Sequence, residues 1–118
     1  MSETNQINNS YPLENITKPS TNDVMLGRGA GTNKHPGNKY FRNVVKAHQD
    51  VYLAAKNNFE KYLTTMEILT TIRSLNPPGR FILQDSSSKL WNDVGSFRCR
   101  LFIFYIDLKS YFIPGDAK

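Results

Sequence analysis

Apolar residues recur at helical spacing over residues 38–56. At 100° per residue these side chains fall within an arc of roughly 140°, while the basic residues of the segment gather on another arc of roughly 100°. The apolar set is Tyr40, Phe41, Val44, Val45, Val51, Tyr52 and Ala55, and the basic set is Lys39, Arg42, Lys46 and Lys56. The pattern therefore predicts a helix with one face toward a core and a positively charged face toward solvent.

A second helix is predicted over residues 58–75. Asn57 and Glu60 have the spacing of a capping box at its start, and the Asn76-Pro77-Pro78-Gly79 segment ends it because proline cannot continue a helix. One apolar stripe contains Phe59, Tyr62, Leu63, Met66 and Leu69, and a second contains Ile68, Ile72 and Leu75. A helix that is apolar on two sides requires cover on two sides.

Short strands are predicted before and after these helices. Residues 24–26 form a first strand that leads into a glycine-rich loop extending to Pro36. Residues 80–85 and 89–94 form a hairpin that turns at three serines, with Phe81 and Leu83 on one face and Trp91 as a large anchor. The six apolar residues 101–106 are too short for a membrane span, and they predict a buried strand.

Length and composition indicate one small α+β domain. A chain of 118 residues with 39% hydrophobic and 21% charged residues is typical of a soluble domain with one core. Residues 1–22 are rich in Asn, Ser and Thr, which predicts a disordered tail. Residues 23–95 then form the domain, and residues 96–118 an atypical hydrophobic tail. The single cysteine, Cys99, excludes an intramolecular disulfide.

Positive charge is concentrated in one region. The net charge is +5, which favours anionic partners, and no acidic residue lies between Asp23 and Asp50. Basic residues stand where a helix start normally favours acids, and glycine-rich backbone before a helix suits the binding of an anion on exposed N–H groups. The predicted phosphate contacts are Arg28, Lys34, His35, Lys39, Arg42 and Lys46. The alternative is a solvated basic face beside a structural loop.

No motif predicts catalysis, a metal or a cofactor. The GRGAGTNK segment does not have the spacing of a Walker A loop, and its glycines do not match a dinucleotide-binding loop. His35 and His48 lack companion ligands at metal spacing. The His35-Pro36-Gly37-Asn38 segment is more typical of a turn in which Asn38 caps the following helix. We therefore predict no catalytic residue, no metal ligand and no cofactor.

Four blocks in the same order resemble a domain of unknown function that recurs in proteins of diatoms and related algae. They are DVMLGRG, HPGNKYFR, GRFIL and WNDVG. The resemblance implies a shared fold but no reaction. The positions that match the family pattern are Asp23, Gly27, Arg28, Gly29, His35, Gly37, Asn38, Phe41, Arg42, Gly79, Arg80, Phe81 and Trp91. After Gly95 the chain departs from this pattern, and we hypothesise a truncated or mis-spliced ending.

These observations together predict an α+β domain with a glycine-rich loop, two packed helices and then a β-hairpin, by analogy with winged-helix domains. The predicted function is non-enzymatic binding of nucleic acid, DNA rather than RNA, in the nucleus or otherwise the cytoplasm. An acidic protein surface is the other anionic partner, and no membrane is expected. The alternative function is a protein-interaction module. A basic stripe that faces solvent favours the first function, and an exposed apolar patch near Trp91 or the second helix favours the second.

Overall fold

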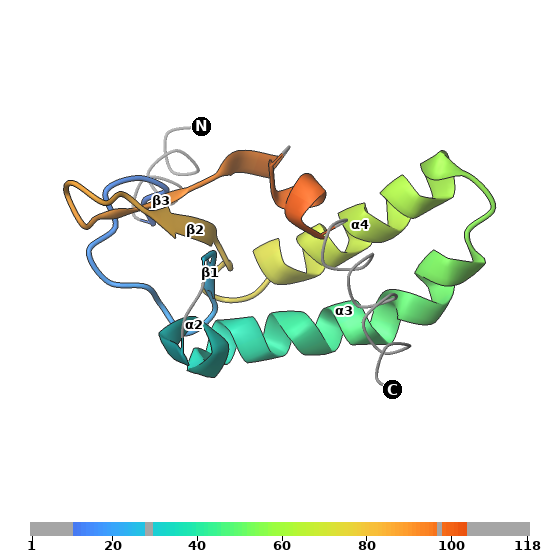
Figure 1. The fold of residues 1–118 in the computed structure, drawn as a ribbon, viewed down its shortest axis with the longest axis horizontal. Coiled ribbons are helices and arrows are strands. Elements are labelled where there is room, and N and C mark those ends of the chain that lie inside the picture. The colour runs from blue at the N-terminus through green and yellow to red at the C-terminus, as the bar shows by residue number, and fades with distance from the viewer. Residues whose placement is uncertain (1–10, 28–29, 97, 104–118) are drawn as a thin grey trace.

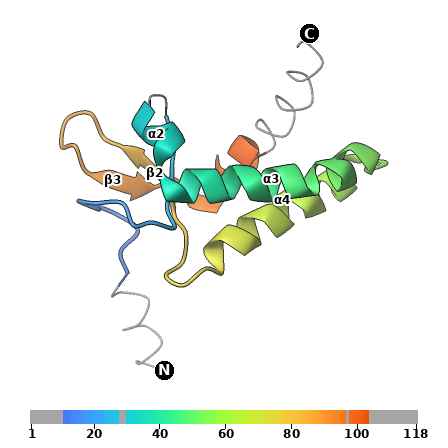
Figure 2. The same cartoon turned by 90° about the horizontal axis from the view of Figure 1, so that it is seen from below.

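The computed structural model describes residues 11–27, 30–96 and 98–103. The elements are β1 (Val24–Met25), α2 (Ala30–Lys34), α3 (Pro36–Ala54), α4 (Asn58–Arg73), β2 (Phe81–Gln84) and β3 (Trp91–Asp93). The small sheet lies at one end of the molecule. Helices α3 and α4 pack side by side and extend away from the sheet, so that the turn between them is at the far end (Figure 1; Figure 2). The α+β class is confirmed.

Helix α3 begins at Pro36, two residues before the predicted start, and ends where Ala55 adopts an extended backbone. Its buried apolar residues are Phe41, Val44, Val45 and Tyr52. Tyr40 and Val51, at the margin of the predicted apolar face, are 42% and 57% exposed. The side of α3 that packs into the core was thus predicted correctly, but the buried face is narrower than predicted.

Helix α4 has the predicted cap at its start. The side chain of Asn57 accepts a hydrogen bond from the N–H of Glu60 at 2.9 Å, and the Glu60 carboxylate accepts one from the N–H of Lys56 at 2.7 Å. A capping box would direct this carboxylate to the N–H of Asn57 instead. The helix buries Ile68, Leu69 and Ile72, whereas the first stripe is exposed at Phe59, Tyr62 and Leu63.

The sheet has the strand order β1-β2-β3. Strand β1 is parallel to β2, with Val24 opposite Phe81, and β2 is antiparallel to β3, with Ile82 opposite Asp93. Parallel neighbours require a long crossover, which here consists of the three helices. Phe81 and Ile82 are both fully buried, whereas Leu83 is 42% exposed. Both faces of β2 are therefore covered where the strand begins, and the face predicted to hold Phe81 and Leu83 is buried at Phe81 but exposed at Leu83.

Residues 11–22 pack on the sheet, in contrast to the predicted disordered tail. Ile16 is 4% exposed, and its backbone exchanges two hydrogen bonds of 2.8 Å with Trp91. The carbonyl of Leu13 also accepts the N–H of Asp93. This pairing covers β3, so the hairpin is not an isolated wing. Residues 1–10 lie outside the described part of the chain.

Two further predictions were wrong in secondary structure. The loop predicted up to Pro36 contains α2. A strand was predicted at residues 101–106, but residues 101–103 belong to a helical segment that includes residues 98–103. Residues 104–106 lie outside the described residues. Cys99 and Ile103, four residues apart, are both buried in the core. A short apolar run alone does not distinguish a strand from a buried helix.

Aromatic rings join the helices to the sheet within the core. The ring of Phe41 in α3 meets that of Phe81 in β2 edge to face, with centroids 5.5 Å apart, and stacks on Phe102 at 5.7 Å. Such arrangements are the favoured geometries of aromatic pairs. Phe41 and Phe81 are both buried in this contact, whereas Trp91 is only half-buried.

Candidate nucleic-acid interface

Four of the predicted phosphate contacts lie on the surface of the helices that follow β1. Lys34 ends α2, and Lys39, Arg42 and Lys46 lie on α3. All four are exposed. Positions i, i+3 and i+7 of a helix share one face, so the three residues of α3 form a row along it. We name Lys34, Lys39, Arg42 and Lys46 the basic surface. Arg28 and Gly29 lie outside the described residues.

Carboxylates do not neutralise the basic surface within the part of the chain that the structure describes. The ion pairs in this part are His48–Glu67, Arg73–Asp93 and Arg80–Asp23. Each of them involves residues outside the basic surface. Its four charges therefore face solvent without an ion-pair partner among the described residues.

Arg42 also has a structural contact. Its Nη2 donates a hydrogen bond of 2.9 Å to the carbonyl of Asn33, near the end of α2. The last carbonyls of a helix lack partners within the helix, and a cation there is favourable. Arg42 thus ties α2 to α3, while its charge remains on the surface.

The start of α3 does not have the open geometry that anion binding on backbone N–H groups requires. Gly37 and Asn38 are buried. A Cβ added to Gly37 would lie 1.9 Å from the carbonyl oxygen of Asp23, so the backbones touch there. Pro36 has no N–H, and the N–H of Asn38 bonds to the carbonyl of His35. Exposed cations remain at this end of α3. The backbone N–H groups that were predicted to bind an anion are instead packed against the chain before β1.

Asn38 pairs with β1 instead of capping α3. Its side-chain oxygen accepts the N–H of Met25 at 2.8 Å, and its side-chain nitrogen donates to the carbonyl of Met25 at 2.9 Å. One amide thereby satisfies both backbone groups of a strand residue. The prediction of a cap was wrong, because the residue that precedes α3 is His35, whose side chain makes no capping hydrogen bond.

His35 likewise contacts the protein. Its half-buried ring places Nε2 2.9 Å from the carbonyl oxygen of Ser20, so this nitrogen carries the proton and donates. His35 therefore fixes the segment before β1 to the start of α3. This contact agrees with the prediction that the residue fixes the turn and leaves its predicted phosphate contact as a hypothesis.

The sequence did not indicate the buried ion pair between Asp23 and Arg80. The guanidinium donates from Nη2 to Oδ2 at 2.7 Å and from Nε to Oδ1 at 3.0 Å. Oδ1 also accepts the backbone N–H of Arg80, and Oδ2 that of Ser20. The remaining contacts of the guanidinium are the carbonyl of Pro12 at 2.6 Å and the ring of Tyr11 at 4.1 Å.

The electrostatics of this pair favour the charged form of the Arg80 guanidinium. Burial alone lowers the pKa of Arg80, but the hydrogen bonds and the charge of Asp23 outweigh burial and raise that pKa above its usual value. The D-V and G-R-F blocks thus meet in space. The pair holds β1, β2 and residues 11–12 together and is not open to a ligand.

A second charged cluster joins α4 to the sheet. Arg73 donates two hydrogen bonds to Asp93, at 2.8 and 3.1 Å. Asp93 also accepts the N–H groups of Phe81 and Gly95. Burial raises the pKa of Asp93, but the combined effect of Arg73 and these N–H groups is larger and lowers the pKa below its usual value. Burial raises the pKa of the neighbouring Cys99 thiol to about 12.

The described residues hold neither a candidate metal-binding cluster nor a candidate membrane span. They contain no cluster of three or more His, Cys, Asp or Glu side chains that could hold a metal ion. Among them, no helix has the length and apolar character needed to cross a membrane.

Comparison with known proteins gives a family. Neither the curated proteins nor the solved structures include a match to this chain. A family match covers residues 23–101. It spans β1 to β3 and continues past Gly95 into the helical segment that contains Cys99. The chain therefore belongs to the family described as a domain of unknown function, DUF6824.

Proposed function

We propose that this domain binds nucleic acid by contacting phosphates with the basic surface. The observation that carries the proposal is the row of Lys39, Arg42 and Lys46 on the solvent face of α3. Their charges are exposed and have no ion-pair partner among the described residues. Lysine and arginine side chains that replace counterions on phosphates supply most of the non-specific affinity of proteins for nucleic acid.

The dimensions of the row suit a duplex. Lys39 and Lys46 are seven residues apart, which corresponds to about 10.5 Å along a helix axis. One strand of a duplex passes about three phosphates over that length. We propose duplex DNA as the ligand and, with it, a nuclear location. Phosphate contacts carry no sequence information, so the expected binding is independent of sequence.

The test is a binding titration of the full chain at two salt concentrations. The probes are a fluorescent duplex DNA, the matched single-stranded DNA and an RNA of the same sequence. For the wild type we expect affinity to fall steeply between about 50 and about 200 mM salt. For Lys39→Gln with Lys46→Gln, we expect the slope of log K against log salt to flatten by about two, one for each lost contact.

A matched control removes the same charge elsewhere. Lys18 and Lys56 are exposed and lie outside the basic surface, so Lys18→Gln with Lys56→Gln lowers the net charge equally. We expect this control to keep the wild-type slope within about half a unit. If the slope flattened equally in both double variants, the salt dependence would reflect general attraction by net charge. That result would reject the basic surface as the binding site. Absence of binding by the wild type would reject the function.

A further inference from the structure

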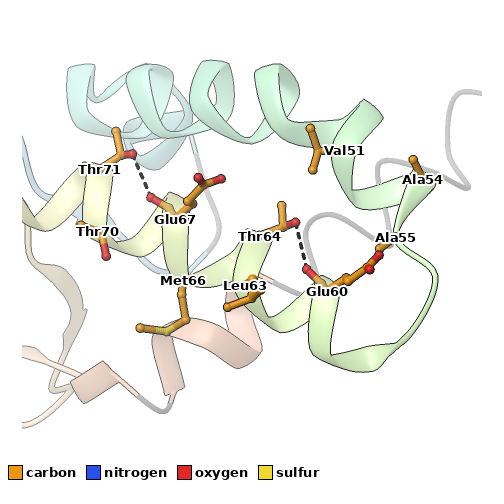
Figure 3. A pocket seen from close by; sticks show the side chains of 10 residues that line it. All are labelled: Val51, Ala54, Ala55, Glu60, Leu63, Thr64, Met66, Glu67, Thr70 and Thr71. Atoms are coloured by element: carbon orange, nitrogen blue, oxygen red, sulfur yellow. Dashed lines mark hydrogen bonds between the residues drawn. The ribbon is translucent and has the colours of Figure 1, made fainter.

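A groove lies between the second half of α3 and the outer side of α4, near the turn that joins them. It has a volume of about 860 Å³. Apolar side chains line it from both helices, with Val51 and Ala54 on α3 and Leu63 and Met66 on α4 (Figure 3). Val51 is 57% exposed and Leu63 is 47% exposed. Apolar groups gathered in a groove at this exposure are typical of interaction sites.

The polar side chains that line the groove are those of two glutamates and three threonines. The hydroxyls of Thr64 and Thr71 donate to the carbonyls of Glu60 and Glu67 within α4, as Figure 3 shows. Among the residues that the structure describes, no lysine or arginine lines the groove. Two carboxylates therefore provide its charge, although the chain as a whole is positive by five.

Neither carboxylate forms an ion pair with a lysine or arginine among the described residues. The Glu60 carboxylate accepts a hydrogen bond from the backbone N–H of Lys56, a neutral group. The side chain of Glu67 is 72% exposed, and its nearest ionisable neighbour is His48, whose Nε2 lies 3.6 Å away. The Nδ1 of His48 lies 2.8 Å from the Val44 carbonyl, so Nδ1 carries the proton. His48 is therefore the basic side chain that faces Glu67 among the described residues, and its Nε2 can donate to this carboxylate only when the ring is charged.

From this arrangement we propose that the groove binds a basic amphipathic helix of a partner protein. Helices bind to helical grooves through one apolar face. Glu60 and Glu67 are seven residues apart, about 10.5 Å along α4. The matching partner has a narrow apolar stripe with lysine or arginine at positions seven residues apart. The groove shares no residue with the basic surface, so this inference does not rest on the proposed binding of nucleic acid.

The test measures binding of two synthetic helices to the full chain by fluorescence anisotropy. One probe has a Leu/Ala face and two lysines seven residues apart, and the other has glutamates in their place. We expect the lysine probe to bind at least about tenfold more tightly. Glu67→Lys is expected to abolish this preference, because each probe then has one attractive and one repulsive contact with residues 60 and 67. Asp50→Lys adds the same charge on an exposed position of α3 outside the groove, and we expect it to keep the preference.

The apolar contact has its own matched pair. Leu63→Gln is expected to weaken binding of the lysine probe about tenfold. Leu53→Gln replaces a leucine of similar exposure, 49%, that does not line the groove, and we expect no loss. Equal losses in both variants, equal affinity for both probes, or no binding of either would overturn the proposal. Self-association of the free protein that Leu63→Gln abolishes would also overturn it, because a second copy would then occupy the groove.

Lys39→Gln with Lys46→Gln is expected to leave probe binding unchanged, which separates this result from the nucleic-acid test.

Discussion

The fully buried carboxylate of Asp23 binds the guanidinium of Arg80, 57 residues later in the chain, with both of its oxygens. Asp23 directly precedes β1, and Arg80 directly precedes β2. The pair therefore fixes the two ends of the long crossover that the helices form. A buried ion pair holds a structure together only when its hydrogen bonds are complete, and the contacts of Arg80 with Pro12 and Tyr11 complete them here.

Removal of one partner of this pair is expected to destabilise the domain strongly. Arg80→Met leaves the Asp23 carboxylate buried without a counter-charge, which costs about 3–5 kcal/mol. The measurement is the free energy of unfolding in urea, followed by the fluorescence of Trp91, the single tryptophan. Arg98→Met is the control, because Arg98 is exposed, and we expect a change within about 0.5 kcal/mol. Similar values for the two variants would contradict a structural role of the pair.

Two glycines in helices are expected to respond to alanine with opposite signs. At Gly37 the added Cβ would lie 1.9 Å from the carbonyl oxygen of Asp23, so either α3 or the chain before β1 must move. Gly31 in α2 has no atom within 4 Å of the same position. Gly31→Ala should therefore stabilise by about 0.5–1 kcal/mol through backbone entropy, whereas Gly37→Ala should destabilise by more than that amount. Thermal unfolding of both variants provides the measurement, and stabilisation by Gly37→Ala would refute the close contact.

Periodicity and caps predicted the parts of the fold that depend on local order. The buried face of α3 and the cap at Asn57 follow from residues within a few positions of one another. The row of exposed cations on α3 follows from the same periodicity. It holds because the opposite side of the helix carries Phe41, Val44 and Val45 into the core.

The remaining features depend on contacts between distant residues, which no local pattern contains. Residues 11–22 look disordered in composition, but backbone pairing of Ile16 with Trp91 needs no apolar run. Asparagine is a residue type that often caps helices, so the sequence alone indicates a cap at Asn38. Only the position of β1 makes Asn38 a partner of Met25. Asp23 and Arg80 are charged residues, which are rarely buried unless paired, and their pairing appears only when β1 lies beside β2.

Acidification is expected to weaken the link between α4 and the sheet. The pKa of Asp93 is lower in the folded state than its usual value, so its charge stabilises the fold above the unfolded pKa of about 3.9 and progressively loses this effect as the pH falls below it. Asp93→Asn removes the charge at every pH. The difference in unfolding free energy between wild type and Asp93→Asn should be largest near neutral pH and shrink below about pH 4. A difference that stays constant from about pH 6 to about pH 3 would rule out this role.

The thiol of Cys99 is expected to react very slowly in the folded protein. Burial raises its pKa to about 12, although the nearby Arg73 guanidinium acts in the opposite direction. The thiolate is the reactive form, and an ordinary cysteine pKa is about 8.5. At about pH 8 the thiolate fraction should therefore be about a thousandfold lower in the native protein than in denaturant. Colorimetric labelling of the single cysteine with and without urea measures both rates. Because Cys99 belongs to the same core as Ile68 and Ile103, fast labelling without urea would show that the helical segment 98–103 separates from α4 in solution.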